Sequence, residues 1–145
     1  MNDTSRRSLL RAAALLPLAG LSWVTARAQS TPKHRVVVHV SDNDPARWIL
    51  ALNNSRNAQE DLGATNVEIE IVAYGPGINM LKSDSSVKQR IAEALKSGVK
   101  VNACQNTMNG MKLTAPDMLP EIGYVPSGVV EVMRKQQQGW AYIRS

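Results

Sequence analysis

The sequence predicts an α/β fold: a three-layer domain with a mostly parallel five-stranded sheet flanked by helices, over residues 36–145. Two observations support this prediction. Short runs of β-branched and apolar residues alternate along the chain with stretches in which apolar residues recur at helical spacing. Strands separated by helices are joined by right-handed crossovers, which bring the strands together in parallel.

The predicted strands differ in how completely other layers cover them. Residues 36–40 are continuously apolar apart from His39, which is typical of a central parallel strand covered on both faces. In the second strand, Glu68 and Glu70 alternate with apolar residues, so its beginning is expected to be less covered. The five predicted strands span residues 36–40, 67–74, 99–104, 124–125 and 140–143.

Boundary signals accompany the three predicted helices. Asp44 followed by Pro45 predicts an N-cap and a proline at the first helical position. Ser127 is the predicted N-cap of the third helix, and residues 114–117 predict a short capped turn. Glycines that end helices follow the apolar stripes at 48–62, 87–95 and 129–136, namely Gly63, Gly98 and Gly139.

Residues 1–28 have the layout of an export signal. Arg6 and Arg7 form a basic start, 15 uncharged residues follow at 12–26, and residues 26–28 are a small-x-small cleavage site before Gln29. A membrane anchor needs about 20 apolar residues, so no membrane attachment is expected after cleavage. Residues 29–35 are predicted to be a polar tether between this signal and the domain.

The basic start of this signal also indicates an export route. Residues 5–11 resemble a twin-arginine (Tat) motif, with paired arginines, a spacer, two apolar residues and a base. This resemblance predicts a periplasmic protein. An ordinary Sec signal that has two adjacent arginines by chance is the alternative.

Removing the signal also removes much of the positive charge. The whole chain of 145 residues has 17 Lys and Arg against 12 Asp and Glu, a net charge of +5. Without residues 1–28, which hold four arginines and one aspartate, 117 residues remain with a net charge of +2. Their bases are scattered and no aromatic residue is interleaved with them, so nucleic acid is not an expected partner.

Several segments, in chain order, resemble one family. They are residues 39–45, 51–54, 73–77, 98–108, 125–131 and 139–143. In these segments the chain resembles proteins of the DsrE/DsrF-like family, in the group with the YchN-like fold, over nearly the whole mature chain. The resemblance implies small α/β subunits that assemble into homotrimers or homohexamers.

The same resemblance implies a role for the single cysteine. Some members of the family are sulfur carriers, in which one cysteine takes up sulfane sulfur from a donor as a persulfide and passes it to an acceptor protein. That cysteine ends the third strand after a Gly-Val-x-x-x-x-Cys stretch, and Gly98 to Cys104 has this spacing. Those carriers are cytoplasmic, whereas this chain carries an export signal, and residues 105–108 differ from the carriers' sequence.

Cys104 is therefore the predicted catalytic residue, and it needs no cofactor or metal. Ligands of open parallel sheets bind beyond the carboxyl ends of the strands, where Cys104 lies. Loop N–H groups or a helix N-terminus there would lower the pKa of the thiol. The predicted substrate-binding residues at the same edge are Asn43, Gly75, Gly77, Gln105, Asn106 and Thr107.

The alternative is that Cys104 is buried and inert, as free cysteines often are. The protein would then be a non-catalytic homo-oligomeric binding module with a structural cysteine. A single cysteine excludes a disulfide within the chain.

Other candidate groups have simpler structural explanations. Met108 and Met111 carry soft sulfur that suits Cu(I), but core packing or subunit contacts are favoured, with Trp140 as a further expected contact. His39 is expected to be a hydrogen-bonded core histidine rather than an assistant of Cys104.

The loops also carry candidates. Asp42 and Asp44 are expected to cap local structure rather than form an acid pair. The Gly-Pro-Gly sequence at 75–77 is expected to be a plain turn, with an anion cradle as the alternative.

Overall fold

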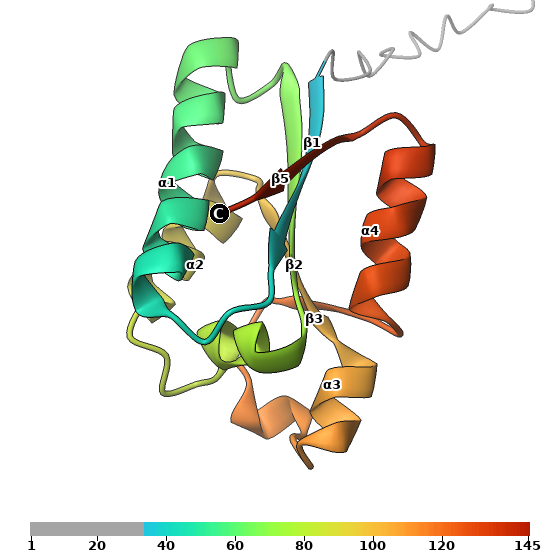
Figure 1. Cartoon of the computed structure of the whole chain (residues 1–145). Helices are drawn as coiled ribbons and strands as arrows, with labels where there is room; N and C mark the ends of the chain where they lie inside the picture. The colour runs from blue at the N-terminus through green and yellow to red at the C-terminus, as the bar shows by residue number, and fades with distance from the viewer. Residues whose placement is uncertain (1–33) are drawn as a thin grey trace, which may run out of the picture.

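A computed structural model describes residues 34–145. The predicted export signal and residues 29–33 of the predicted tether lie outside the described residues. In the described part, a five-stranded parallel sheet forms the middle layer (Figure 1). The strands are β1 (His34–Val40), β2 (Val67–Ala73), β3 (Lys100–Cys104), β4 (Gly123–Val125) and β5 (Ala141–Arg144), in the order β4-β3-β2-β1-β5. The predicted three-layer α/β fold is confirmed.

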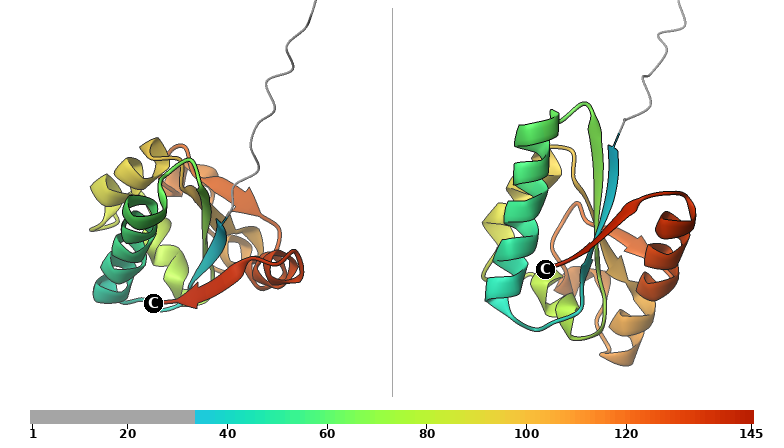
Figure 2. Two further views of the ribbon diagram at one scale, coloured as in Figure 1. Left: turned by 90° about the horizontal axis from the view of Figure 1, so that it is seen from above. Right: turned by 45° about the horizontal axis from the view of Figure 1, so that its top comes forward.

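Helices cover both faces of the sheet. The helices α1 (Pro45–Leu62) and α2 (Lys88–Lys96) cover one face, and α4 (Gly128–Gln137) covers the other (Figure 2). Three shorter helical segments complete the described part, namely η1 (Gly75–Leu81), α3 (Gln105–Gly110) and η2 (Ala115–Asp117). Of the helices in residues 34–145, none combines the length and the apolar character that a membrane crossing requires.

The hydrophobic core is divided between the two faces. The larger cluster, which includes Ile69, Ile71 and Ile91, fills the space beneath α1 and α2. The smaller one, which includes Val72 and Trp140, lies beneath α4. Neighbouring residues of a strand point to opposite faces, so a central strand needs apolar side chains on both, which explains the continuous apolar run in β1.

The boundaries of α1 follow the signals in the sequence. The Asp44 Oδ1 atom accepts a hydrogen bond from the Ala46 N–H at 2.9 Å, which satisfies one of the free donors of the first turn. At the other end, Gly63 has a φ of 87° and donates to the Gln59 carbonyl at 3.0 Å. A side chain would strain this left-handed conformation, which is why a glycine ends the helix here.

Some boundaries differ from the sequence prediction. Strand β1 begins two residues early, because the His34 N–H bonds to the Asn66 carbonyl at 3.0 Å and His34 pairs with Val67. The break predicted at residues 75–77 is the start of η1. The short helix α3 was not predicted from its polar sequence. Ser127 occupies the N-cap position of α4, but its side chain makes no capping hydrogen bond.

Strand β2 is covered from Glu70 onward, which is more of the strand than predicted. The Glu70 side chain is 3% exposed, and its Oε2 atom lies 2.6 Å from the Nζ atom of Lys135 in α4. The Asn102 side chain donates to the other carboxylate oxygen at 2.8 Å. Glu68 behaves as expected, because it pairs at the surface with Lys100. The period-two pattern marks the same face for both glutamates, but α4 covers only one of them.

Candidate functional site

Cys104 lies where two helices begin. It is the last residue of β3 and the N-cap of α3, and its side chain is buried, with 4% of the residue exposed. Its Sγ atom accepts hydrogen bonds from the N–H of Gly128 at 3.2 Å and of Thr107 at 3.5 Å. Gly128 is the first residue of α4. The positive ends of two helix dipoles therefore face one sulfur atom.

These donors favour the thiolate form of Cys104. Burial raises the pKa of the thiol, because it disfavours the charged form. Hydrogen bonds from the Thr107 side chain and from the N–H groups of Gly128, Thr107 and Asn106 act in the opposite direction and outweigh burial. The pKa of Cys104 is therefore lower than that of an ordinary thiol, which is the property expected of a reactive cysteine.

Hydrogen bonds join the loops that follow the first three strands. The Gly75 N–H donates to the Thr107 hydroxyl at 3.0 Å, which links the end of β2 to the residue that contacts Cys104. The Gly77 N–H donates to the Ser41 carbonyl at 3.1 Å, which links η1 to the end of β1. Three consecutive strand ends thus form one connected edge, with the cysteine on the third.

The predicted substrate-binding residues have different places around this edge. The Thr107 N–H donates to the sulfur, and Gly75 acts through Thr107. The Asn106 N–H donates to the Pro126 carbonyl at 3.2 Å and lies close enough to the sulfur to help lower the pKa of the thiol. Asn43 and Gln105 are exposed and make no hydrogen bond with Cys104. Their part in binding a substrate stays a prediction.

Gly77 contributes through its lack of a side chain. A Cβ atom at this position would lie 2.4 Å from the Val40 carbonyl oxygen, so the close approach of η1 to β1 requires glycine. The N–H groups of Gly75 and Gly77 are both engaged within the chain. Residues 75–77 therefore form the first turn of η1, and their N–H groups hold the end of β1 and the start of α3 in place.

Gly128 was not singled out from the sequence, although it contacts Cys104 directly. A Cβ atom at Gly128 would lie 2.6 Å from the Cδ1 atom of Tyr74, so only glycine lets α4 start this close to both Tyr74 and the sulfur. The one signal in the sequence is a glycine directly after a predicted N-cap. That signal does not reveal the partner, which lies 24 residues earlier in the chain.

Beside this site lies an aromatic cluster built around His39. The imidazole stacks on Tyr74 with ring centroids 4.5 Å apart, and its Nδ1 atom shares a hydrogen bond of 2.8 Å with the Tyr142 hydroxyl. Burial and the Arg144 charge lower the pKa of His39, and Asp42 opposes them. The prediction of a hydrogen-bonded core histidine is confirmed.

The expected subunit contact at Trp140 is wrong, and core packing is the one of the two expected roles that Met108 has. Met108 and Trp140 are buried within their own chain, where they pack into the two cores, while Met111 is 45% exposed. The two methionines therefore have different surroundings, which gives no support to a shared Cu(I) site. In residues 34–145, no three His, Cys, Asp or Glu side chains are grouped so that they could hold a metal ion.

The two loop aspartates form no acid pair, but only Asp44 has the predicted capping role. Asp44 caps α1, and Asp42 forms an ion pair with Arg144 at 3.2 Å. The capped turn predicted at 114–117 is also present, since the Thr114 N–H donates to the Asp117 carboxylate at 2.7 Å.

Comparisons with known proteins agree with this architecture. The sequence model of the DsrE/DsrF-like family matches residues 34–144. A protein of unknown function from Methanobacterium thermoautotrophicum, MTH1491, is 39% identical, with a TM-score of 0.74 over 77% of this chain and 99% of its own. No curated protein matches the chain.

Two more distant structures share the fold. The ychN protein of E. coli is 11% identical, with a TM-score of 0.62 over 79% of this chain and all of its own. A conserved protein of unknown function from Bacteroides thetaiotaomicron, BT1422, is 16% identical, with a TM-score of 0.59 over 77% of this chain and 94% of its own.

Proposed function

We propose that this chain, which belongs to the DsrE/DsrF-like family, carries sulfane sulfur as a persulfide on Cys104. Membership of this family suggests a role in sulfur metabolism. The observation that supports this proposal best is the pair of N–H groups, from Gly128 and Thr107, that donate to Sγ. They stabilise negative charge on sulfur, and a thiolate is the nucleophile in sulfur uptake.

The proposed reaction has two matched steps. In loading, the Cys104 thiolate attacks the sulfane sulfur of a donor persulfide or polysulfide, the donor's S–S bond breaks, and the donor's remaining sulfur leaves as a thiolate. In unloading, an acceptor thiolate attacks the outer sulfur, and Cys104 leaves as a thiolate. No net oxidation occurs and no metal takes part. The donors on Sγ stabilise Cys104 each time it is a thiolate.

The alternative function is a non-catalytic homo-oligomeric binding module. The observation in its favour is that Cys104 is buried and its sulfur accepts N–H groups at the start of two helices. This capping role does not require a reactive thiol. The two functions differ in whether the native thiol reacts.

The experiment compares the mature protein with Cys104→Ser after treatment with polysulfide. We expect native protein to gain the mass of one sulfur atom, removable by a reductant, and the serine variant to gain nothing while keeping its fold. Sulfur loading that persists in the variant would disprove the carrier. A native thiol that reacts with alkylating reagents only after unfolding would favour the structural cysteine.

We also propose that the protein is exported by the Tat route to the periplasm and works there as a homotrimer or homohexamer. The support for export is the motif at residues 5–11 and the cleavage site before Gln29. N-terminal sequencing of the exported protein should begin at Gln29, and lysine at both Arg6 and Arg7 should block export. Normal export of that variant would disprove the Tat route, and the segment would then be an ordinary Sec signal.

A further inference from the structure

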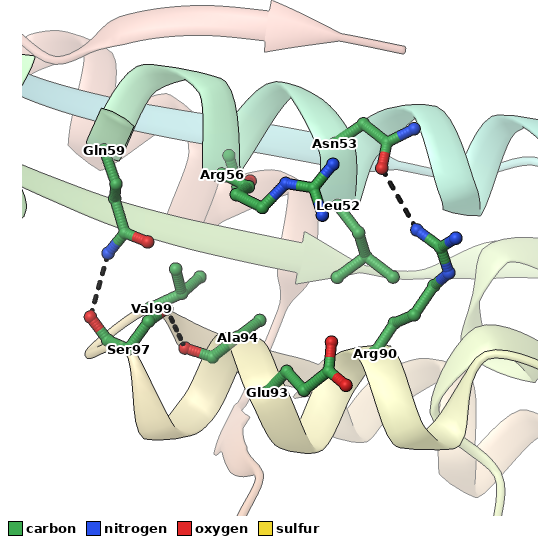
Figure 3. A pocket seen from close by; sticks show the side chains of 10 residues that line it. Leu52, Asn53, Arg56, Gln59, Arg90, Glu93, Ala94, Ser97 and Val99 are labelled. Carbon is green, nitrogen blue, oxygen red and sulfur yellow. Dashed lines mark hydrogen bonds between the residues drawn. The ribbon is translucent and has the colours of Figure 1, made fainter. Parts of the chain in front are cut away.

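A pocket of about 240 Å³ lies between α1 and α2, on the face of the sheet opposite α4 (Figure 3). Its apolar lining comes from Leu52, Ala94 and Val99. Drug-sized ligands occupy pockets of roughly 300–1,000 Å³, so this one suits a smaller molecule.

Two hydrogen bonds between the pocket walls bracket this space. The Arg90 guanidinium donates to the Asn53 side chain at 3.1 Å, and the Gln59 side chain donates to the Ser97 carbonyl at 2.9 Å. Both bonds are drawn in Figure 3, one toward each end of the pocket. These two bonds tie α1 to α2 and to the turn after α2. The pocket between them is therefore a feature of the folded chain.

Charges of both signs line this pocket: Arg56, Arg90 and Glu93. The Arg90 guanidinium is engaged in one of the two bonds across the pocket, so Arg56 and Glu93 are the two charged groups open to a ligand. Arg56 extends from α1 and Glu93 from α2, and Figure 3 shows them on opposite walls with Leu52 between them. Arg56 pairs only loosely, through its Nε atom, with Glu60 at 3.6 Å. Within residues 34–145, Glu93 makes no ion pair and its side chain makes no hydrogen bond. A ligand that bridges the walls would satisfy both charges.

We propose that this pocket binds a small zwitterion with an apolar side chain, the chemical class of a free aliphatic α-amino acid. The ligand's carboxylate pairs with Arg56, its ammonium group pairs with Glu93, and its side chain packs on Leu52 and Val99. A plain anion leaves Glu93 without a partner. A neutral apolar molecule leaves both charges unpaired. The site is separate from Cys104 and does not depend on the proposed sulfur chemistry.

Calorimetric titration of the mature protein with L-leucine tests this proposal. We expect saturable binding of leucine. N-acetyl-leucine, which lacks the ammonium group, and leucinamide, which lacks the carboxylate, should each bind at least about tenfold more weakly. Absence of saturable binding would overturn the proposal, and so would equal affinity for leucine and N-acetyl-leucine.

Variants of the two charged residues identify the site. Arg56→Gln and Glu93→Gln should each weaken leucine binding at least about tenfold. Arg47→Gln and Lys96→Gln, on the same helices but outside the pocket, should leave it unchanged. Circular dichroism checks that each variant is folded. Unchanged affinity in Glu93→Gln would disprove the assignment. Cys104→Ser should still bind leucine, so failure of the sulfur proposal is distinguishable from failure of this one.

Discussion

At the scale of single residues, the sulfur of Cys104 replaces an oxygen cap for two helices. The Cys104 side chain accepts the Thr107 N–H of α3, and it accepts the Gly128 N–H of α4, whose N-cap Ser127 makes no side-chain bond. A sulfur atom is a weak acceptor when it is a thiol and a much better one when it is a thiolate. The same contacts that begin the helices therefore also favour the charged form of the cysteine.

Gly128→Ala tests how closely α4 must approach this sulfur. The added Cβ would lie 2.6 Å from Tyr74 Cδ1, so α4 must shift away, weakening the bond to Sγ. We expect a loss of about 1–3 kcal/mol in the free energy of unfolding, measured by urea denaturation, and a higher pKa of the thiol. Gly110→Ala is the control, because a Cβ there meets nothing within 4 Å. Equal stability of both variants would contradict the close approach.

The His39 cluster makes stability depend on pH. The folded-state pKa of His39 is lowered, by burial first and Arg144 second, so between this pKa and about 6.5 the unfolded chain binds more protons than the folded one. The stabilising contribution is therefore complete above about pH 6.5 and is lost as the pH falls toward the folded pKa. Melting temperatures measured from pH 7.5 to 5 should decline less in His39→Gln, and an identical decline would assign the effect to other groups.

How much the sequence predicts at this scale depends on whether the partner is local. The cap at Asp44 was predictable because its partner, Ala46, lies two residues away. The position of Cys104 was predictable because parallel strands end at one edge. The donor Gly128 was not, since its bond to Cys104 exists only after β4 and α4 have packed.

At the scale of elements, α4 is fixed to the sheet by a buried ion pair. Lys135 reaches over the Trp140 ring, with Nζ 4.2 Å from the ring centroid, to Glu70 in β2. Its side chain is 15% exposed, and that of Glu70 is 3% exposed. Buried charges are costly unless paired, so this contact defines where α4 can sit.

Lys135→Met should therefore be strongly destabilising. It leaves the Glu70 carboxylate buried with only Asn102 as a donor, which costs about 3–5 kcal/mol in the free energy of unfolding. The matched control is Lys100→Met, which removes a pair of similar length, 2.7 Å, that is more exposed, and should cost at most about 1 kcal/mol. Urea denaturation measures both. Similar losses would mean that burial does not control the strength of the pair.

The elements found by pattern alone are the long ones with a clear apolar signature. Helix α1 buries a face that recurs roughly every three to four residues, so its sequence shows that period. Strand β1 is covered on both faces, so its sequence shows a continuous apolar run. Helix α3 has six residues, one of them buried, and is started by a cysteine, so it shows no such period. Glu70 had the pattern of an exposed strand residue because its partner Lys135 lies 65 positions later in the chain.

At the scale of the whole molecule, the two faces of the sheet are covered unequally. Two helices pack on one face, and α4 alone packs on the other (Figure 1). Large apolar side chains remain exposed on and beside α4, with Val129 at 58%, Met133 at 49% and Tyr142 at 45%. Exposed apolar residues gathered on one side are typical of protein contact surfaces.

This surface is where we expect copies of the chain to meet, in place of the predicted contacts at Met108 and Trp140. A 117-residue domain has a limited core, and burying Val129, Met133 and Tyr142 between subunits would add to it. The mature protein should therefore sediment as a trimer or hexamer at micromolar concentration. Met133→Glu places a charge on this surface and should shift the protein to monomers. Leu50→Glu, similarly exposed but in α1 on the other face of the sheet, should not. A wild-type protein that sediments as a monomer would disprove the assembly. If Met133→Glu still forms the same oligomer, the subunit interface does not include this surface.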